Sequence, residues 1–152
     1  MELVTKQKID HFLAGKTLAI AGASRFESSF SAQVAKHLTK LGYNLWYVNP
    51  AFDSNQIENQ HVQTIDKLPK DVNHVLVLTN KSQTEWVVQQ IIAKGIRNVW
   101  IQQQSDTPEA LELAYQNSLN VIHHHCIFMF SQPEGMHKFH HRIKKIFGKI
   151  PK

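Results

Sequence analysis

Several features that would assign a protein to a common class are missing from this chain. It has one cysteine, Cys126, so no disulfide framework can form within it, and a reducing compartment is expected. No apolar stretch approaches the roughly 18 residues that a membrane span needs. The first residues also lack the apolar segment of a signal peptide. We therefore expect a cytoplasmic protein.

Glycine is scarce as well, with six among 152 residues, and this bears on nucleotide binding. The P-loop pattern G-x-x-x-x-G-K-[ST] does not occur. A dinucleotide-binding turn needs several glycines after the first strand and an acid at the end of the second. Here only Gly22 follows the first apolar run, and Asn49 ends the second. These absences argue against an NAD enzyme, although the Asn49 amide could still bind a ribose.

Acidic residues are outnumbered, 12 against 17 lysines and arginines, which gives a net charge of +5. Part of the excess lies in a tail that carries Lys138, Arg142, Lys144, Lys145, Lys149 and Lys152. Such a tail is compatible with nucleic acid, an anionic membrane or a polyanionic small molecule. We favour a solvated tail, with a protein partner or a homo-oligomer left open and no nucleic acid as partner.

The sequence is rich in short apolar runs that alternate with helical periodicity. We predict strands at 17–21, 44–48, 74–78, 98–101 and 120–123. Helices are predicted at 5–13, 30–41, 82–94, from 108 to about 115, and 137–147, with Ser28 or Ser29, Ser82 and Thr107 as candidate caps. This alternation is typical of an α/β fold with a parallel sheet. We expect one domain over 1–152, with a core at about 15–127 and an extension at 128–152.

The loop after the first predicted strand is the best candidate for a phosphate site. Gly22 allows close approach of the backbone, Arg25 offers several N–H donors, and the serines at 28, 29 and 31 precede or open a helix. The alternative is that these serines only cap the helix. The residues alone support the two interpretations equally.

Five segments in order resemble a known family: Ala19-Ile20-Ala21-Gly22-Ala23-Ser24 with Ser29 or Ser31, Tyr47-Val48-Asn49-Pro50, residues 64–74, Val99-Trp100-Ile101-Gln102, and residues 121–126. Over 17–127 the chain is similar to the small stand-alone CoA-binding proteins. Their domain resembles the CoA-binding domain of the succinyl-CoA synthetase alpha subunit. The resemblance implies a Rossmann-like three-layer fold, with a five-stranded sheet ordered 3-2-1-4-5. CoA or acyl-CoA would lie across the carboxyl ends of its strands.

The resemblance also implies positions for CoA along the chain. The phosphates would meet the loop, and the nucleotide end would meet the turn after the second strand. The implied cofactor-binding residues are Gly22, Ala23, Ser24, Arg25, Ser29, Ser31, Asn49, Pro50, Thr79, Asn80, Lys81, Gln102 and Cys126. The chain departs from the family at Thr79-Asn80, where a pair of arginines is common, and at Gln102-Gln103, where a glycine is often found.

Catalytic and metal-binding patterns are weak. On a regular strand His123 and His125 would face one way and His124 and Cys126 the other, which leaves too few ligands per face for zinc. His137 and His141 have helical ligand spacing but lack the glutamate of a metalloprotease motif. We therefore expect structural histidines, no metal, and a core position for the tryptophans at 46, 86 and 100. Cys126 is expected to be buried, with a mixed disulfide to CoA as the alternative.

These observations lead to a non-enzymatic CoA-binding module as the first hypothesis, because the catalytic domain of the synthetases has no counterpart here. The second hypothesis is a small nucleotide-dependent enzyme, either an NAD(P) oxidoreductase or a transferase. The third is an adaptor that binds a protein partner through the basic tail.

Overall fold

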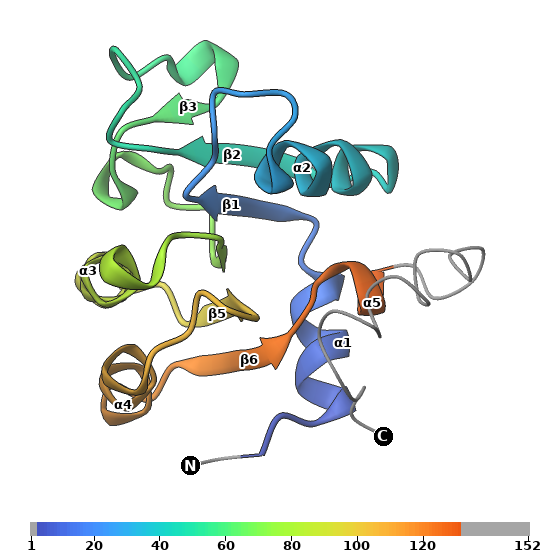
Figure 1. Ribbon diagram of the computed structural model, residues 1–152, viewed down its shortest axis with the longest axis vertical. Coiled ribbons are helices and arrows are strands. Elements are labelled where there is room, and N and C mark those ends of the chain that lie inside the picture. Colours follow the sequence, from blue (N-terminus) through green and yellow to red (C-terminus); the bar gives the residue numbers. More distant parts are fainter. Residues whose placement is uncertain (1–2, 132–152) are drawn as a thin grey trace.

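The computed structural model describes residues 3–131, which form one parallel sheet covered by helices on both faces (Figure 1). The strands are β1 (Thr17–Ala21), β2 (Asn44–Val48), β3 (His61–Val62), β4 (His74–Val77), β5 (Asn98–Gln102) and β6 (Asn120–His125). The helices are α1 (Lys6–Ala14), α2 (Phe30–Lys40), α3 (Lys81–Lys94), α4 (Pro108–Gln116) and α5 (Phe128–Ser131). Two short 3₁₀ turns, η1 (Ile57–Asn59) and η2 (Ile65–Lys67), lie on either side of β3. The α/β fold with a parallel sheet is thus confirmed.

The number of strands and the place of one of them differ from the prediction. The sheet has six strands in the order β3-β2-β1-β4-β5-β6, not five. The additional strand, β3, is two residues long, so it shows no periodicity in the sequence. The expected order placed the segment 74–78 at the edge of the sheet, next to β2. In the structure β3 occupies this edge, and the segment 74–78 forms β4, which pairs with β1 in the centre.

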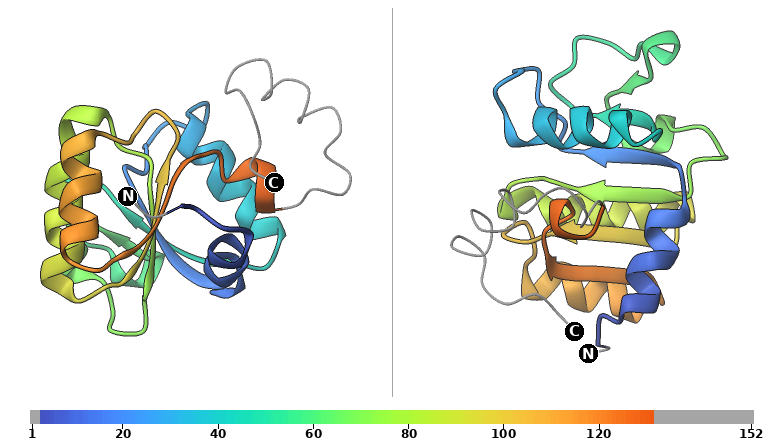
Figure 2. Two further views of the ribbon diagram at one scale, coloured as in Figure 1. Left: turned by 90° about the horizontal axis from the view of Figure 1, so that it is seen from below. Right: turned by 90° about the vertical axis from the view of Figure 1, so that its right-hand side faces the viewer.

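The helices form the two outer layers of the fold, with the sheet seen edge-on between them (Figure 2). Alternate residues of β1 enter opposite cores because side chains of a strand point to opposite faces. Leu18 and Ile20 pack in the cluster with residues of α1, α2 and α5. Ala19 and Ala21 pack in the cluster with residues of α3 and α4. Burial on both faces explains why the central strands read as continuous apolar runs.

Two of the three predicted caps are found. The side chain of Ser29 accepts a hydrogen bond from Ala32 N at the start of α2, and Thr107 does the same for Ala110 N in α4. The prediction for α3 is wrong, because this helix begins at Lys81 with Asn80 as its N-cap and Ser82 inside its first turn. Asn80 has extended backbone angles but makes no side-chain cap bond.

The tryptophans divide into two kinds. Trp46 and Trp100 are buried as predicted, whereas Trp86 in α3 is 47% exposed, so its assignment to the core is wrong. The predicted helix at 137–147, and with it most of the predicted extension and the basic tail, lies outside the described residues. None of the helices among residues 3–131 is both long and apolar enough to cross a lipid bilayer.

Candidate functional site

The loop between β1 and α2 begins with a tight contact between the ends of two strands. Gly22 has φ +87°, and a Cβ atom at this position would lie 2.9 Å from Leu78 C and Thr79 N. The N–H groups of Gly22 and Ala23 both donate to Val48 O, at 3.0 and 3.2 Å. Gly22 is therefore needed for the packing of β1 against the end of β4. The two N–H groups that follow β1 are used by the fold.

The serines of the loop bind mainly to the loop itself. Ser24 N donates to Ser31 Oγ at 2.8 Å, and the hydroxyls of Ser29 and Ser31 are 3.2 Å apart. Ser24 Oγ accepts from Phe26 N at 3.0 Å. Ser31 is buried. This network fixes the path of the loop into α2, so Ser29 and Ser31 shape the anion site more than they extend into it.

Donors for an anion remain at the start of α2. Within residues 3–131 the structure gives no hydrogen bond from the backbone N–H groups of Arg25, Phe30 and Ser31. The N-terminus of an 11-residue helix adds its partial positive charge. The side chain of Arg25 lines a neighbouring cavity of about 730 Å³, which we call the cationic pocket. Its charged lining residues are Arg25, Glu27, Lys36 and Lys40, and it also contains His61, Tyr47 and Phe52.

A second cavity of about 280 Å³ lies on the other side of the loop, between the ends of β1, β2 and β4 and the helix α3. We call it the amide pocket, because its polar lining includes the side-chain amides of Asn49, Gln63, Asn80, Gln83 and Gln90. None of the described residues that line it is charged. The half-exposed indole of Trp86 also lines it. A neutral pocket with a flat aromatic wall and several amides is suited to a heteroaromatic base.

Asn49 and Pro50 both line the amide pocket, at the nucleotide end that the resemblance implied. The Asn49 amide is already engaged by the protein. Its Nδ2 donates to Ala23 O at 2.7 Å, and its Oδ1 accepts from Ala51 N at 2.8 Å. Asn49 thus ties the loop to the end of β2, and the remaining amide hydrogen and lone pair are left for a ligand.

The third group of implied residues lies at a cavity of about 540 Å³ between the ends of β4 and β5, here called the β4–β5 pocket. Thr79 and Asn80 line both this pocket and the amide pocket, whereas Lys81 and Gln102 line only this one. Thr79 is buried, and its hydroxyl lies 2.8 Å from that of Thr84. Thr84 Oγ1 donates its single hydroxyl hydrogen to Ser105 O at 2.7 Å. The hydroxyl of Thr79 is therefore the donor in its hydrogen bond with Thr84. Thr79 therefore joins the two strand ends, while Asn80 and Lys81 face the opening.

Gln102 is buried at the end of β5. Its Oε1 accepts from Ile127 N at 3.1 Å, and its Nε2 has no hydrogen-bond partner among the described residues. Cys126, next to it, is 1% exposed and belongs to the core cluster with α1 and α2. Burial raises the pKa of the Cys126 thiol, and this outweighs the hydrogen bond that the Gln102 side chain can give to a thiolate. The burial of Cys126 and its raised pKa both disfavour the thiolate that a mixed disulfide with CoA requires.

We expect Cys126 to stay unmodified when the native protein is treated with oxidised CoA. The buried, protonated thiol reacts slowly because the thiolate is the nucleophile. Intact mass spectrometry tests this. The same treatment in urea is the matched control and should yield the adduct. An adduct formed as fast in the native protein as in urea would contradict the assignment of Cys126 to the core.

Sequence reasoning missed the amides contributed by Gln63, Gln83 and Gln90, as well as the position of Trp86. Three of these four residues could have been found from their spacing, because Gln83, Trp86 and Gln90 recur on one side of the helix α3. Gln63 follows β3 and reaches the pocket only through the fold.

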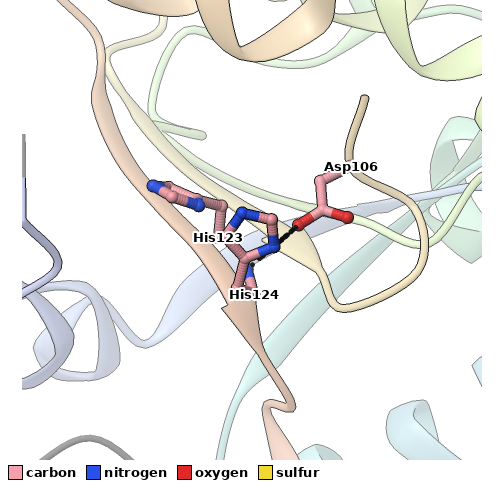
Figure 3. A group of neighbouring side chains, drawn as sticks. All are labelled: Asp106, His123 and His124. Carbon is pink, nitrogen blue, oxygen red and sulfur yellow. Dashed lines mark hydrogen bonds and ion pairs between the residues drawn. The ribbon is translucent and has the colours of Figure 1, made fainter. Parts of the chain in front are cut away.

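The histidines at 123 and 124 lie beside each other, contrary to the expected alternation. His124 has φ +59°, a backbone conformation that side chains rarely adopt, and the pairing of β5 with β6 is irregular at this point. The two rings are 4.4 Å apart between centroids, and Asp106 approaches from the segment after β5 (Figure 3). The pKa of His123 is lowered to about 4, mainly by burial and next by the neighbouring His124, so this ring is neutral at neutral pH.

Comparisons with known proteins agree with this architecture. A hypothetical protein from Pyrococcus horikoshii is 25% identical, with a TM-score of 0.72 over 84% of this chain and 94% of that one. A structure from Thermus thermophilus is 23% identical, with a TM-score of 0.73 over 83% and 96%. A protein redesigned for binding is 20% identical, with a TM-score of 0.74 over 100% and 99%. The last two likenesses concern the fold alone.

The model of the CoA binding domain family matches residues 16–132 of this chain. The match includes all six strands and every residue of the three pockets described above. The chain therefore belongs to the CoA binding domain family.

Proposed function

We propose that the protein binds CoA or acyl-CoA at the carboxyl edge of its sheet and that it does so without catalysing a reaction. The observation that carries this proposal is the pair of unlike pockets on the two sides of the β1 loop. Ser24 lines both the neutral amide pocket and the cationic pocket. A ligand with an uncharged base and several phosphates close to it suits this arrangement, and CoA has this composition.

The three pockets suggest an order for the parts of CoA. Adenine suits the amide pocket, where Trp86 offers a flat surface and the amides offer both donors and acceptors. The phosphates suit Arg25 and the N-terminus of α2. The pantetheine arm is neutral and polar, and it suits the β4–β5 pocket, which Thr79 and Asn80 connect to the amide pocket. The dipole of α2 and the cations near it favour the phosphate charge in this position.

Non-enzymatic binding is favoured by how the polar groups near the pockets are used. The hydroxyls of Ser24, Ser29, Ser31 and Thr79 hold strand ends and loops together. The thiol of Cys126 is buried and protonated. These groups therefore support the walls of a binding site, and none is placed as an activated nucleophile beside a general base.

Arg25→Ala is expected to weaken CoA binding by about 1–3 kcal/mol, or about five- to 150-fold, because it removes a charge-assisted contact with phosphate. Isothermal titration calorimetry with CoA measures this change. Lys70→Ala is the matched control, because Lys70 is an exposed cation outside the three pockets. An unchanged affinity in Arg25→Ala would show that the phosphates of CoA bind at another site. Absence of CoA binding by the parent protein would reject the function itself.

A further inference from the structure

We propose that His123, His124 and Asp106 form a binding site for a divalent transition metal ion such as Zn²⁺. One nitrogen from each histidine and one oxygen of Asp106 lie within 4.8 Å of one another. Figure 3 shows the His124 ring between the His123 ring and the Asp106 carboxylate. The site does not depend on CoA, since none of the three residues lines the amide, cationic or β4–β5 pocket.

The backbone brings the two neighbouring histidines to the same place. His124 adopts φ +59°, which interrupts the alternation that would place its side chain on the opposite face from His123. Asp106 holds this conformation, because its Oδ2 accepts from His124 N at 3.1 Å. The same oxygen lies 2.5 Å from His124 Nδ1. One carboxylate thus fixes both the backbone and the ring of His124.

An unsatisfied nitrogen provides a second and independent observation. His123 is 5% exposed, and its Nδ1 is buried without a hydrogen-bond partner among the described residues. Its Nε2 lies 3.0 Å from the hydroxyl of Tyr115. A buried nitrogen without a partner is unfavourable unless something binds to it. A metal ion on Nδ1 would satisfy it.

The contact with Tyr115 is what a metal-binding histidine requires. With a metal on Nδ1, the proton of the neutral ring is on Nε2 and can be donated to the tyrosine oxygen. Such a bond from the second ring nitrogen orients histidine ligands in metal sites.

The donor set determines the class of metal. Two imidazoles and one carboxylate suit Zn²⁺ and other borderline ions of the first transition row better than Ca²⁺ or Mg²⁺, which prefer oxygen. Tetrahedral zinc holds nitrogen ligands at about 2.0–2.1 Å, which places two of them about 3.4 Å from each other. The 2.5 Å contact between His124 Nδ1 and Asp106 Oδ2 must therefore open on binding and give up the proton it shares. His124 can move because its side chain is 60% exposed. Three protein ligands leave a fourth position for water.

The experiment uses the full chain in a background that carries alanine at 137, 140 and 141, because these histidines of the tail could bind metal independently. The protein is freed of metal with a chelator and titrated with Zn²⁺ against a chromophoric chelator. We expect one equivalent of Zn²⁺ to bind. His124→Ala and Asp106→Asn should each weaken binding at least tenfold. His125→Ala is the matched control and should bind as the parent does.

Cobalt provides a spectroscopic test of the same site. Co²⁺ bound to nitrogen and oxygen ligands should give visible absorption bands that disappear in His124→Ala. The exposed position of His124 means that this variant should keep the circular dichroism spectrum and the urea midpoint of the parent without metal. Zinc binding that is absent, or that is unchanged in both His124→Ala and Asp106→Asn, would overturn the proposal and leave only the direct contact between His124 and Asp106.

Discussion

Gly22→Ala is expected to lower the free energy of unfolding by about 3 kcal/mol and to weaken CoA binding with it. Two effects add at this position. An L-residue with a left-handed backbone conformation costs about 1–2 kcal/mol. The new methyl group would lie 2.9 Å from backbone atoms of Leu78 and Thr79, which cannot turn away as a side chain does. Overpacking of this kind costs about 1–3 kcal/mol.

Gly95→Ala is the matched control for this substitution. Gly95 has φ +82°, close to the +87° of Gly22, but a Cβ at this position would meet no atom within 4 Å. We therefore expect Gly95→Ala to show only the backbone cost, about 1–2 kcal/mol. Urea denaturation of both variants measures the difference. Equal losses in the two variants would show that the loop after β1 does not press against the end of β4.

Trp86→Ala is expected to weaken CoA binding by about 1–3 kcal/mol, because a base stacked on an aromatic side chain loses about this much when the ring is removed. The substitution should change stability little, since Trp86 is half-exposed. Trp86→Phe keeps a flat surface and should retain most of the affinity. Calorimetry with CoA, and separately with adenosine 3′,5′-bisphosphate and with pantetheine, locates the loss. We expect the bisphosphate to be affected and pantetheine to be unaffected.

Glu85→Ala is the control on the same helix, because Glu85 is exposed and lies outside the three pockets. Fluorescence adds a second readout, since the other two tryptophans are buried. CoA should change the emission of the parent protein, and Trp86→Phe should lose most of this change. Trp86→Ala with the affinity of the parent would contradict the placement of adenine in the amide pocket.

The central part of the fold was predictable because local patterns and tertiary packing agree there. The apolar run of β1, the spacing of Val34 and Leu38 in α2, and the caps at Ser29 and Thr107 each point to the structure that forms. The short strand β3 was not predictable, because two residues have no period. Trp86 was assigned to the core by its type, and only the fold shows that its part of α3 faces a pocket.

The candidate site was predictable in outline but not in its contacts. The resemblance identified the loop after β1 and the turn after β2, and both line the pockets. The individual assignments of phosphate and pantetheine contacts stay predictions. The amides of Asn49 and Gln63 carry no local signal that tells a ligand contact from a contact with the protein. The pairing of His123 with His124 depends on one left-handed residue, and the sequence places a histidine there rather than a glycine or asparagine.

A ligand series tests the central claim most directly. The midpoint of thermal unfolding of the purified full chain is measured with CoA, acetyl-CoA, NAD, NADP and ATP in parallel. Native mass spectrometry of separate, unheated samples records which of these ligands are bound. CoA and acetyl-CoA should raise the midpoint of unfolding and bind one per chain, because binding to the folded state alone stabilises it. NAD and NADP lack the pantetheine arm, and their turn needs the glycines that this loop lacks. A clear response to NAD, NADP or ATP, with none to CoA, would contradict CoA binding at this edge of the sheet.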